Sequence, residues 1–132
     1  MKLFLIAGEP SGDNLGAALM AGLRQLAPDV EFMGIGGPAM EAEGLSSRFP
    51  MDELSLMGIW EILPKYRALK ARIAETAQAI ADEKPDALIT IDSPDFCLRV
   101  ARQARALNPD LRTIHYVAPS VWAWRAGRAK KM

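Results

Sequence analysis

Residues 3–16 read LFLIAGEPSGDNLG, and this stretch sets the expected fold. The apolar run Leu3–Ala7 is typical of a parallel strand that is covered on both faces. Three glycines, Gly8, Gly12 and Gly16, then follow at intervals of four. Their spacing is neither the dinucleotide fingerprint G-x-G-x-x-G nor a P-loop, because no Gly-Lys-Ser/Thr triplet closes it. We therefore predict a turn between a buried strand and a helix, a place that lines the ligand crevice in open α/β sheets.

Strand and helix periodicities alternate along the rest of the chain. The apolar spacing predicts strands over 31–35, 87–91 and 113–117, and helices over 13–27, 57–81 and 95–107. This alternation predicts a right-handed, doubly wound parallel sheet of the Rossmann-like α/β class. Residues 1–132 form one domain in this interpretation. The final segment AWRAGRAKKM has the pattern of an opening helix without a cap, so we expect the domain to be truncated.

The composition restricts the classes of partner. The chain of 132 residues carries 16 basic and 16 acidic side chains, which argues against a general nucleic-acid binder. Residues 1–63 hold nine acids and three bases, whereas residues 85–132 hold four acids and eight bases, so an anionic partner is expected for the later half. The single cysteine, Cys97, cannot form an internal disulfide, which indicates a cytosolic protein. One histidine and one cysteine do not make a zinc site, and no metal or cofactor is expected.

An acidic residue follows the strand 87–91. Asp92 stands at the carboxyl end of that strand, where a structural and a functional role are both open. Ser93 suits a helix N-cap and Pro94 the first helical position, so Asp95 falls in the first turn, where the helix dipole favours a carboxylate.

Polar residues in the glycine-rich turn have less specific patterns. Ser11 lacks the G-x-S-x-G context of a nucleophile, so helix capping or binding of a ligand through its hydroxyl is favoured. Glu9 precedes a proline and is held extended, facing either solvent or the crevice.

His115 lies in the apolar strand TIHYV, where a hydrogen-bonded core residue is the favoured interpretation and catalysis the alternative. Further on, Trp122 and Trp124 lie beside Arg125, Arg128 and two lysines. This pattern fits stacking on single-stranded nucleic acid, but a surface for phosphate or lipid headgroups explains it at least as well.

Five segments together resemble one family. They are GEPSGDNLGA at 8–17, GGPAMEAEG at 36–44, LMGIWEILPKY at 56–66, IDSPDF at 91–96 and HYVAPSVWAWR at 115–125, and they are similar to the lipid-A-disaccharide synthase family. The resemblance implies an inverting glycosyltransferase of the GT-B type with two Rossmann-like domains, of which this chain resembles the first. Cys97 and Ala118 depart from the family pattern, which usually has asparagine and often serine there.

The resemblance also implies a reaction and a location. The family transfers 2,3-diacylglucosamine from its UDP derivative to 2,3-diacylglucosamine 1-phosphate, at the cytoplasmic face of the bacterial inner membrane. The resemblance does not decide whether the complete enzyme is a homodimer. The alternatives are another GT-B enzyme with a lipid-linked acceptor, and a non-enzymatic nucleotide-binding module of flavodoxin-like type.

The expected site combines these residues. Asp92 matches the family's candidate catalytic aspartate, with Glu9 and Ser11 across the cleft from it. Backbone N–H groups of the glycine-rich turn are expected to meet a sugar or phosphate. The substrate-binding candidates are Gly8, Glu9, Ser11, Gly12, Asp95, His115, Ser120 and Trp122. The segment has more apolar residues than packing on the sheet requires, and four basic residues lie beside them. This pattern predicts membrane docking through Met57, Trp60, Ile62, Leu63, Tyr66 and Leu69.

Overall fold

A parallel sheet with helices on both faces forms the body of the molecule. The computed structural model describes residues 1–55, 66–92 and 94–116; for Ser55, Tyr66, Ala68, Leu69, Pro94 and Asp95 it describes the backbone alone. The elements in chain order are β1 (Lys2–Ile6), α1 (Pro10–Leu26), β2 (Glu31–Ile35), α2 (Pro38–Ala42), α3 (Asp52–Ser55), α5 (Tyr66–Glu83), β3 (Ala87–Thr90), α6 (Pro94–Leu107) and β4 (Thr113–His115). The strand order is β2-β1-β3-β4 and every pairing is parallel. The predicted α/β class is confirmed.

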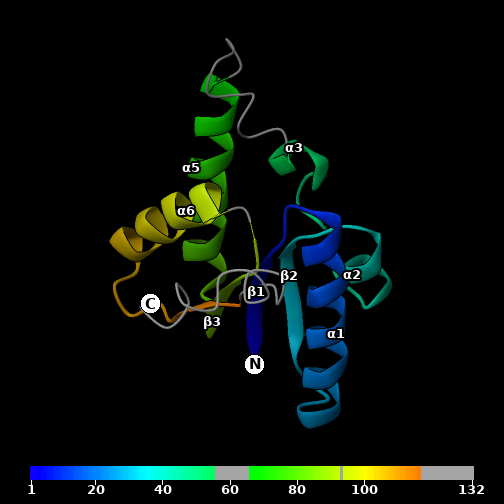
Figure 1. Ribbon diagram of the computed structural model, residues 1–132. Helices are drawn as coiled ribbons and strands as arrows, with labels where there is room; N and C mark the ends of the chain where they lie inside the picture. Colours follow the sequence, from blue (N-terminus) through cyan, green and yellow to red (C-terminus); the bar gives the residue numbers. More distant parts are fainter. Residues whose placement is uncertain (56–65, 93, 117–132) are drawn as a thin grey trace, which may run out of the picture.

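Two apolar cores lie on opposite faces of the sheet, and the alternation of β1 divides them. Phe4 and Ile6 pack with α5 and α6, whereas Leu3 and Leu5 pack with α1 and α2. Figure 1 shows the same arrangement, with α5 and α6 on one side of the sheet and α1 and α2 on the other. All strands therefore end at one edge, where a site in this class of fold is expected.

The observed elements differ from the predicted ones mainly at their ends. The strand 31–35 is confirmed as predicted, and the helix predicted over 13–27 begins earlier, at Pro10. The helix predicted over 57–81 is represented by α5 from Tyr66 to Glu83, and 56–65 lie outside the described residues. The short helices α2 and α3 were not predicted, because four or five residues are too few to show a helical period.

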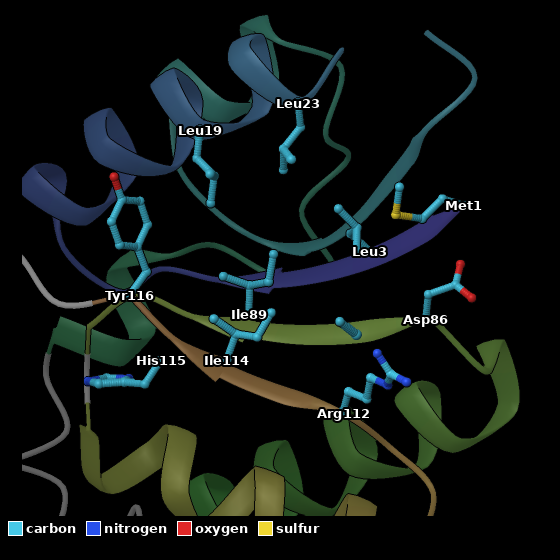
Figure 2. Close-up of a pocket in the computed structure, with 11 residues that line it drawn as sticks. Met1, Leu3, Leu19, Leu23, Asp86, Ile89, Arg112, Ile114, His115 and Tyr116 are labelled. Carbon is cyan, nitrogen blue, oxygen red and sulfur yellow. The ribbon is translucent and has the colours of Figure 1, made fainter. Parts of the chain in front are cut away.

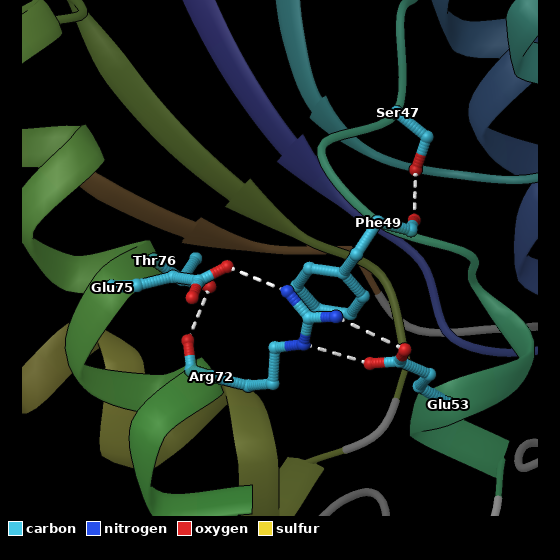
Figure 3. A network of polar contacts seen from close by, with 6 residues as sticks. All are labelled: Ser47, Phe49, Glu53, Arg72, Glu75 and Thr76. Atoms are coloured by element: carbon cyan, nitrogen blue, oxygen red, sulfur yellow. Dashed lines mark hydrogen bonds and ion pairs between the residues drawn. The ribbon is translucent and has the colours of Figure 1, made fainter. Parts of the chain in front are cut away.

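A charged network holds α3 against α5. The Arg72 guanidinium donates to both carboxylate oxygens of Glu53, at 2.8 and 3.1 Å, and to Glu75 at 2.8 Å (Figure 3). It also lies over the ring of Phe49, 4.5 Å from the ring centroid. These hydrogen bonds raise the pKa of Arg72, that to Glu53 most. The network fixes the segment that precedes residue 56 to the helix that follows residue 65.

No helix in the part of the chain that the structure describes is long and apolar enough to cross a membrane.

Candidate functional site

Asp92 joins the end of β3 to the turn between β1 and α1. The backbone N–H of Gly8 donates to its Oδ1, and the N–H of Glu9 donates to its Oδ2 at 3.1 Å. Glu9 is the N-cap of α1, and no side-chain hydrogen bond of its own caps that helix. The carboxylate of Asp92 therefore lies at the N-terminus of α1, a helix end where negative charge is favoured.

Gly12 is required by the same contact. A Cβ atom at residue 12 would overlap Oδ2 of Asp92 and lie 3.4 Å from the side chain of Ile91. The glycine thus lets the first turn of α1 approach the end of β3, and no ligand is needed to explain it.

Gly12→Ala is expected to lower the free energy of unfolding by about 1–3 kcal/mol, because the added methyl group overpacks a site next to a fixed carboxylate. Gly22→Ala is the matched control in the same helix. Nothing lies within 4 Å of a Cβ at residue 22. This variant is therefore expected to gain about 0.4–1 kcal/mol from the lower entropy of its unfolded chain. Urea unfolding of both variants measures the difference, and equal stabilities would contradict the role given to Gly12.

A second aspartate serves the neighbouring helix in the same way. Asp13 is buried, with 4% of its surface exposed. Its Oδ1 accepts the N–H groups of Gly37 and Met40, and its Oδ2 accepts that of Ala39, each at 2.9 Å. A Cβ at Gly37 would stand 2.7 Å from Oδ2, so this glycine also makes room for an aspartate. Sequence reasoning missed Asp13, which it treated only as the start of a helix.

Three expectations about the glycine-rich turn need correction. The N–H groups of Gly8 and Glu9 donate to Asp92, so these two donors are already occupied and do not serve a sugar or phosphate. Glu9 does not lie across a cleft from Asp92, because its own N–H binds that carboxylate. Ser11 is exposed in the first turn of α1 and does not cap it, since the N-cap is Glu9.

His115 does not lie in the core. Every residue of β4 is exposed, and within the described part of the predicted strand 113–117, which reaches Tyr116, the strand ends at His115. The ring Nδ1 lies 2.8 Å from Oγ1 of Thr90, which is buried on the adjacent strand. This hydrogen bond fixes the ring at the carboxyl end of the sheet, the same edge that carries Asp92.

Cys97 connects α6 to the same strand end. Its Sγ donates to the backbone oxygen of Asp92 at 3.0 Å. Burial of the thiol, and secondly the charge of Asp92, raise its pKa. At this departure from the family pattern the thiol thus satisfies a local backbone acceptor, and it is protonated and unreactive at neutral pH.

A polar pocket of about 500 Å³ opens beyond the end of β2. Its lining includes Gly36, Gly37, Glu41, Arg48 and Asp52. The backbone N–H of Gly37 donates to Asp13, so the pocket borders the contact between Asp13 and α2. The sequence did not single out Arg48, because an isolated basic residue in a loop carries no pattern.

The remaining candidates lie wholly or partly outside the described residues. Ser120 and Trp122 are outside them, as are the membrane-docking candidates Met57, Trp60, Ile62 and Leu63. Asp95 belongs to the first turn of α6, as predicted, and Tyr66 and Leu69 belong to α5, but their side chains are not described. Membrane docking stays a prediction.

Comparison with known proteins gives one consistent result. A family model described as lipid-A-disaccharide synthetase matches residues 3–132. The chain is 71% identical over 132 residues to the lipid-A-disaccharide synthase of Ruegeria pomeroyi, covering all of this chain and 33% of that protein. It is 52% identical over 133 residues to the synthase of Rhodospirillum centenum, covering 100% of this chain and 33% of that protein. It is 51% identical over 132 residues to the synthase of Pseudomonas syringae pv. tomato, covering 100% of this chain and 34% of that protein. The chain thus spans about a third of the length of the curated relatives it matches.

Proposed function

We propose that this chain, which belongs to the lipid-A-disaccharide synthetase family, forms the N-terminal, acceptor-side part of a GT-B glycosyltransferase. The reaction is transfer of 2,3-diacylglucosamine from its UDP derivative to the 6-hydroxyl of 2,3-diacylglucosamine 1-phosphate, which forms a β-1,6 linkage. The observation that carries the proposal is the family match over residues 3–132. The donor pocket belongs to the part of the relatives that this chain does not span.

Asp92 is the residue that we propose as general base. An inverting transfer needs a group that takes the proton of the acceptor hydroxyl while its oxygen attacks the anomeric carbon. Asp92 stands at the carboxyl end of β3, and two backbone N–H groups hold its carboxylate in one orientation. A carboxylate oxygen accepts more than one hydrogen bond, so these contacts are compatible with a further one from a substrate hydroxyl.

His115 is the alternative base. It is exposed and pairs in register with Thr90 of the neighbouring strand, whose Oγ1 lies 2.8 Å from the ring Nδ1. As a base, the imidazole would donate from Nδ1 to Oγ1 of Thr90 and take up the proton at Nε2. The variants Asp92→Asn and His115→Gln separate the two residues, as described in the Discussion.

The bacterial inner membrane is the proposed place of action, with the protein at its cytoplasmic face. Both substrates carry acyl chains, so the reaction requires access to a lipid surface. The candidate docking residues between 57 and 69 support this through their sequence pattern alone, an apolar surplus followed by basic residues.

A transfer assay tests the proposal. The UDP derivative of 2,3-diacylglucosamine and its 1-phosphate acceptor are supplied to the 132-residue chain and to the protein extended to the length of its relatives. We expect disaccharide from the extended protein only, because one wall of a two-domain cleft cannot bind the donor. Transfer by the short chain would overturn the two-domain interpretation, and a folded extended protein that prefers another UDP-sugar would overturn the substrate.

A further inference from the structure

The polar pocket beyond the end of β2 contains a basic side chain, Arg48, that lies outside ion-pair distance of every carboxylate in the described part of the chain. The pocket has a volume of about 500 Å³. We propose that Arg48 binds the 1-phosphate of the acceptor, so that this pocket is a subsite for a sugar phosphate. The identity of that acceptor rests on the proposed function.

The loop that carries Arg48 is fixed on the end of β2. The backbone N–H of Arg48 donates to the oxygen of Gly34 at 3.0 Å. The neighbouring Ser47 accepts the N–H of Gly36 through Oγ at 3.1 Å, and the same hydroxyl donates to the oxygen of Phe49 at 2.7 Å (Figure 3). Because hydrogen bonds on both sides hold the backbone of Arg48, little order has to be imposed on this loop when a ligand binds.

Two short helices complete the pocket, and each is held by contacts within the chain. Glu41 belongs to α2, whose backbone donates to Asp13. Asp52 belongs to α3, which Arg72 holds against α5 through Glu53. The pocket is therefore formed by the fold itself, as is usual for small-molecule sites.

The charged groups of the pocket favour a sugar phosphate over other ligands. A guanidinium binds a phosphate through two parallel hydrogen bonds. The carboxylate of Glu41 is exposed and can accept the hydroxyl groups of a sugar. An acyl chain would desolvate both charged groups without giving either a partner, and an anion without hydroxyl groups would be repelled by Glu41.

The position of the pocket suits the acceptor if Asp92 is the base. Only β1 lies between β2 and β3, so the pocket and Asp92 are about 10 Å apart, two strand spacings along one edge of the sheet. Both border consecutive residues of α1. Gly37 of the pocket donates to Asp13, and a Cβ at Gly12 would overlap the carboxylate of Asp92. The 6-hydroxyl and the 1-phosphate project from opposite sides of the ring oxygen, so one acceptor with a hydrogen bond at each end spans this distance.

Two other arginines are less suited to this role. The guanidinium of Arg72 is engaged by two glutamates (Figure 3). Arg112 lines an apolar groove of about 490 Å³ between α1 and β4, but it lies where the strands begin, at the opposite end of β4 from His115 (Figure 2). Of these three arginines, Arg48 alone combines a polar pocket, the carboxyl edge of the sheet and a guanidinium without an ion pair.

Steady-state kinetics of the extended protein test the proposal. Arg48→Gln removes the charge and keeps a hydrogen-bond donor. We expect KM for 2,3-diacylglucosamine 1-phosphate in detergent micelles to rise about 10-fold to 100-fold, because a charge-assisted contact is lost. KM for the UDP donor should change by less than about threefold. With 2,3-diacylglucosamine, which lacks the phosphate, the variant and the unsubstituted protein should have equal kcat/KM.

Arg102→Gln is the matched control, because it removes the same charge from an exposed position on α6. It should leave KM for both acceptors unchanged. Arg48 is itself exposed and makes no ion pair with the described residues, so Arg48→Gln is expected to fold normally, which thermal unfolding checks.

A binding measurement separates this proposal from the proposed function. Glucosamine 1-phosphate, which has no acyl chains, is titrated into the extended protein and followed by phosphorus NMR. Arg48→Gln should weaken its binding at least about 10-fold, and Arg48→Lys, which keeps the charge without the planar fork, should restore part of it. Since binding needs no turnover, this result is interpretable even if the transfer assay fails.

Three results would overturn the proposal. Equal affinity of Arg48→Gln and the unsubstituted protein for glucosamine 1-phosphate, or no binding to either, would exclude Arg48 as the group that holds the phosphate. Inorganic phosphate that binds as tightly as glucosamine 1-phosphate would identify a site for free phosphate. If Arg48→Gln weakened binding to vesicles of anionic phospholipid and left KM for the acceptor in micelles unchanged, the partner of Arg48 would be a membrane headgroup.

Discussion

Asp92→Asn is expected to lower the turnover number of the extended protein by about 100-fold or more, the usual contribution of a general base. The amide cannot take a proton from the acceptor hydroxyl. KM is expected to change much less, because the substituted side chain keeps its size and one acceptor oxygen. Initial rates with the UDP derivative as donor, over a range of pH, measure both quantities.

The structure changes what this variant should do to stability. The carboxylate of Asp92 accepts the N–H groups of Gly8 and Glu9, so the substitution also changes a contact that holds the fold. Asparagine turns an amide donor toward one of them, at an expected cost of about 1–3 kcal/mol in the free energy of unfolding. Thermal unfolding must therefore accompany the kinetics.

The pH profile separates a base from a purely structural residue. Loss of a base removes the acidic limb of the rate profile, whereas loss of a helix-end contact lowers the melting temperature and leaves that limb in place. A folded Asp92→Asn protein with near-normal turnover would exclude Asp92 as the base. His115→Gln is then the next variant to measure.

Asp13→Ala is expected to lower the free energy of unfolding by roughly 3 kcal/mol or more. The substitution removes the acceptor of three N–H groups, those of Gly37, Ala39 and Met40, at a site that is only 4% exposed. Asp13→Asn keeps one acceptor oxygen, so its free energy of unfolding should lie between that of the unsubstituted protein and that of Asp13→Ala. Urea unfolding measures the series.

Asn14→Ala provides the matched control, since it is the next residue of α1 and is exposed. Its effect should stay within about 0.5 kcal/mol. If Asp13→Ala were as stable as Asn14→Ala, the three hydrogen bonds would contribute little, and the packing of α2 would have to rest on its apolar contacts alone.

The sequence predicts the framework of this fold better than its polar contacts. The apolar runs of β1 and β2 and the stripe of α5 identify themselves by their periods, because burial on a sheet demands those periods. The position of Asp92 at the end of a strand was predictable for the same reason. Because of the order of the strands, Asp92 lies at the same edge of the sheet as the first turn of α1.

The partners of the two aspartates were not predictable from local pattern. Glycines that admit a carboxylate look the same in the sequence as glycines that admit a phosphate, and the difference depends on residues more than twenty positions away. His115 was misplaced for a similar reason. Its apolar neighbours suggest burial, but the exposure of β4 is decided by what lies beside it in space.

The two aspartate contacts also differ in when they can form during synthesis. A chain that leaves the ribosome N-terminus first can close the Asp13 contacts as soon as Met40 has emerged. The N–H groups of Gly8 and Glu9 must remain with water until Asp92 appears, more than eighty residues after them. β1 can likewise pair with β2 early in synthesis, whereas its pairing with β3 comes later. Contacts of long sequence separation form slowly, so the first turn of α1 gains its contacts with Asp92 long after it is translated.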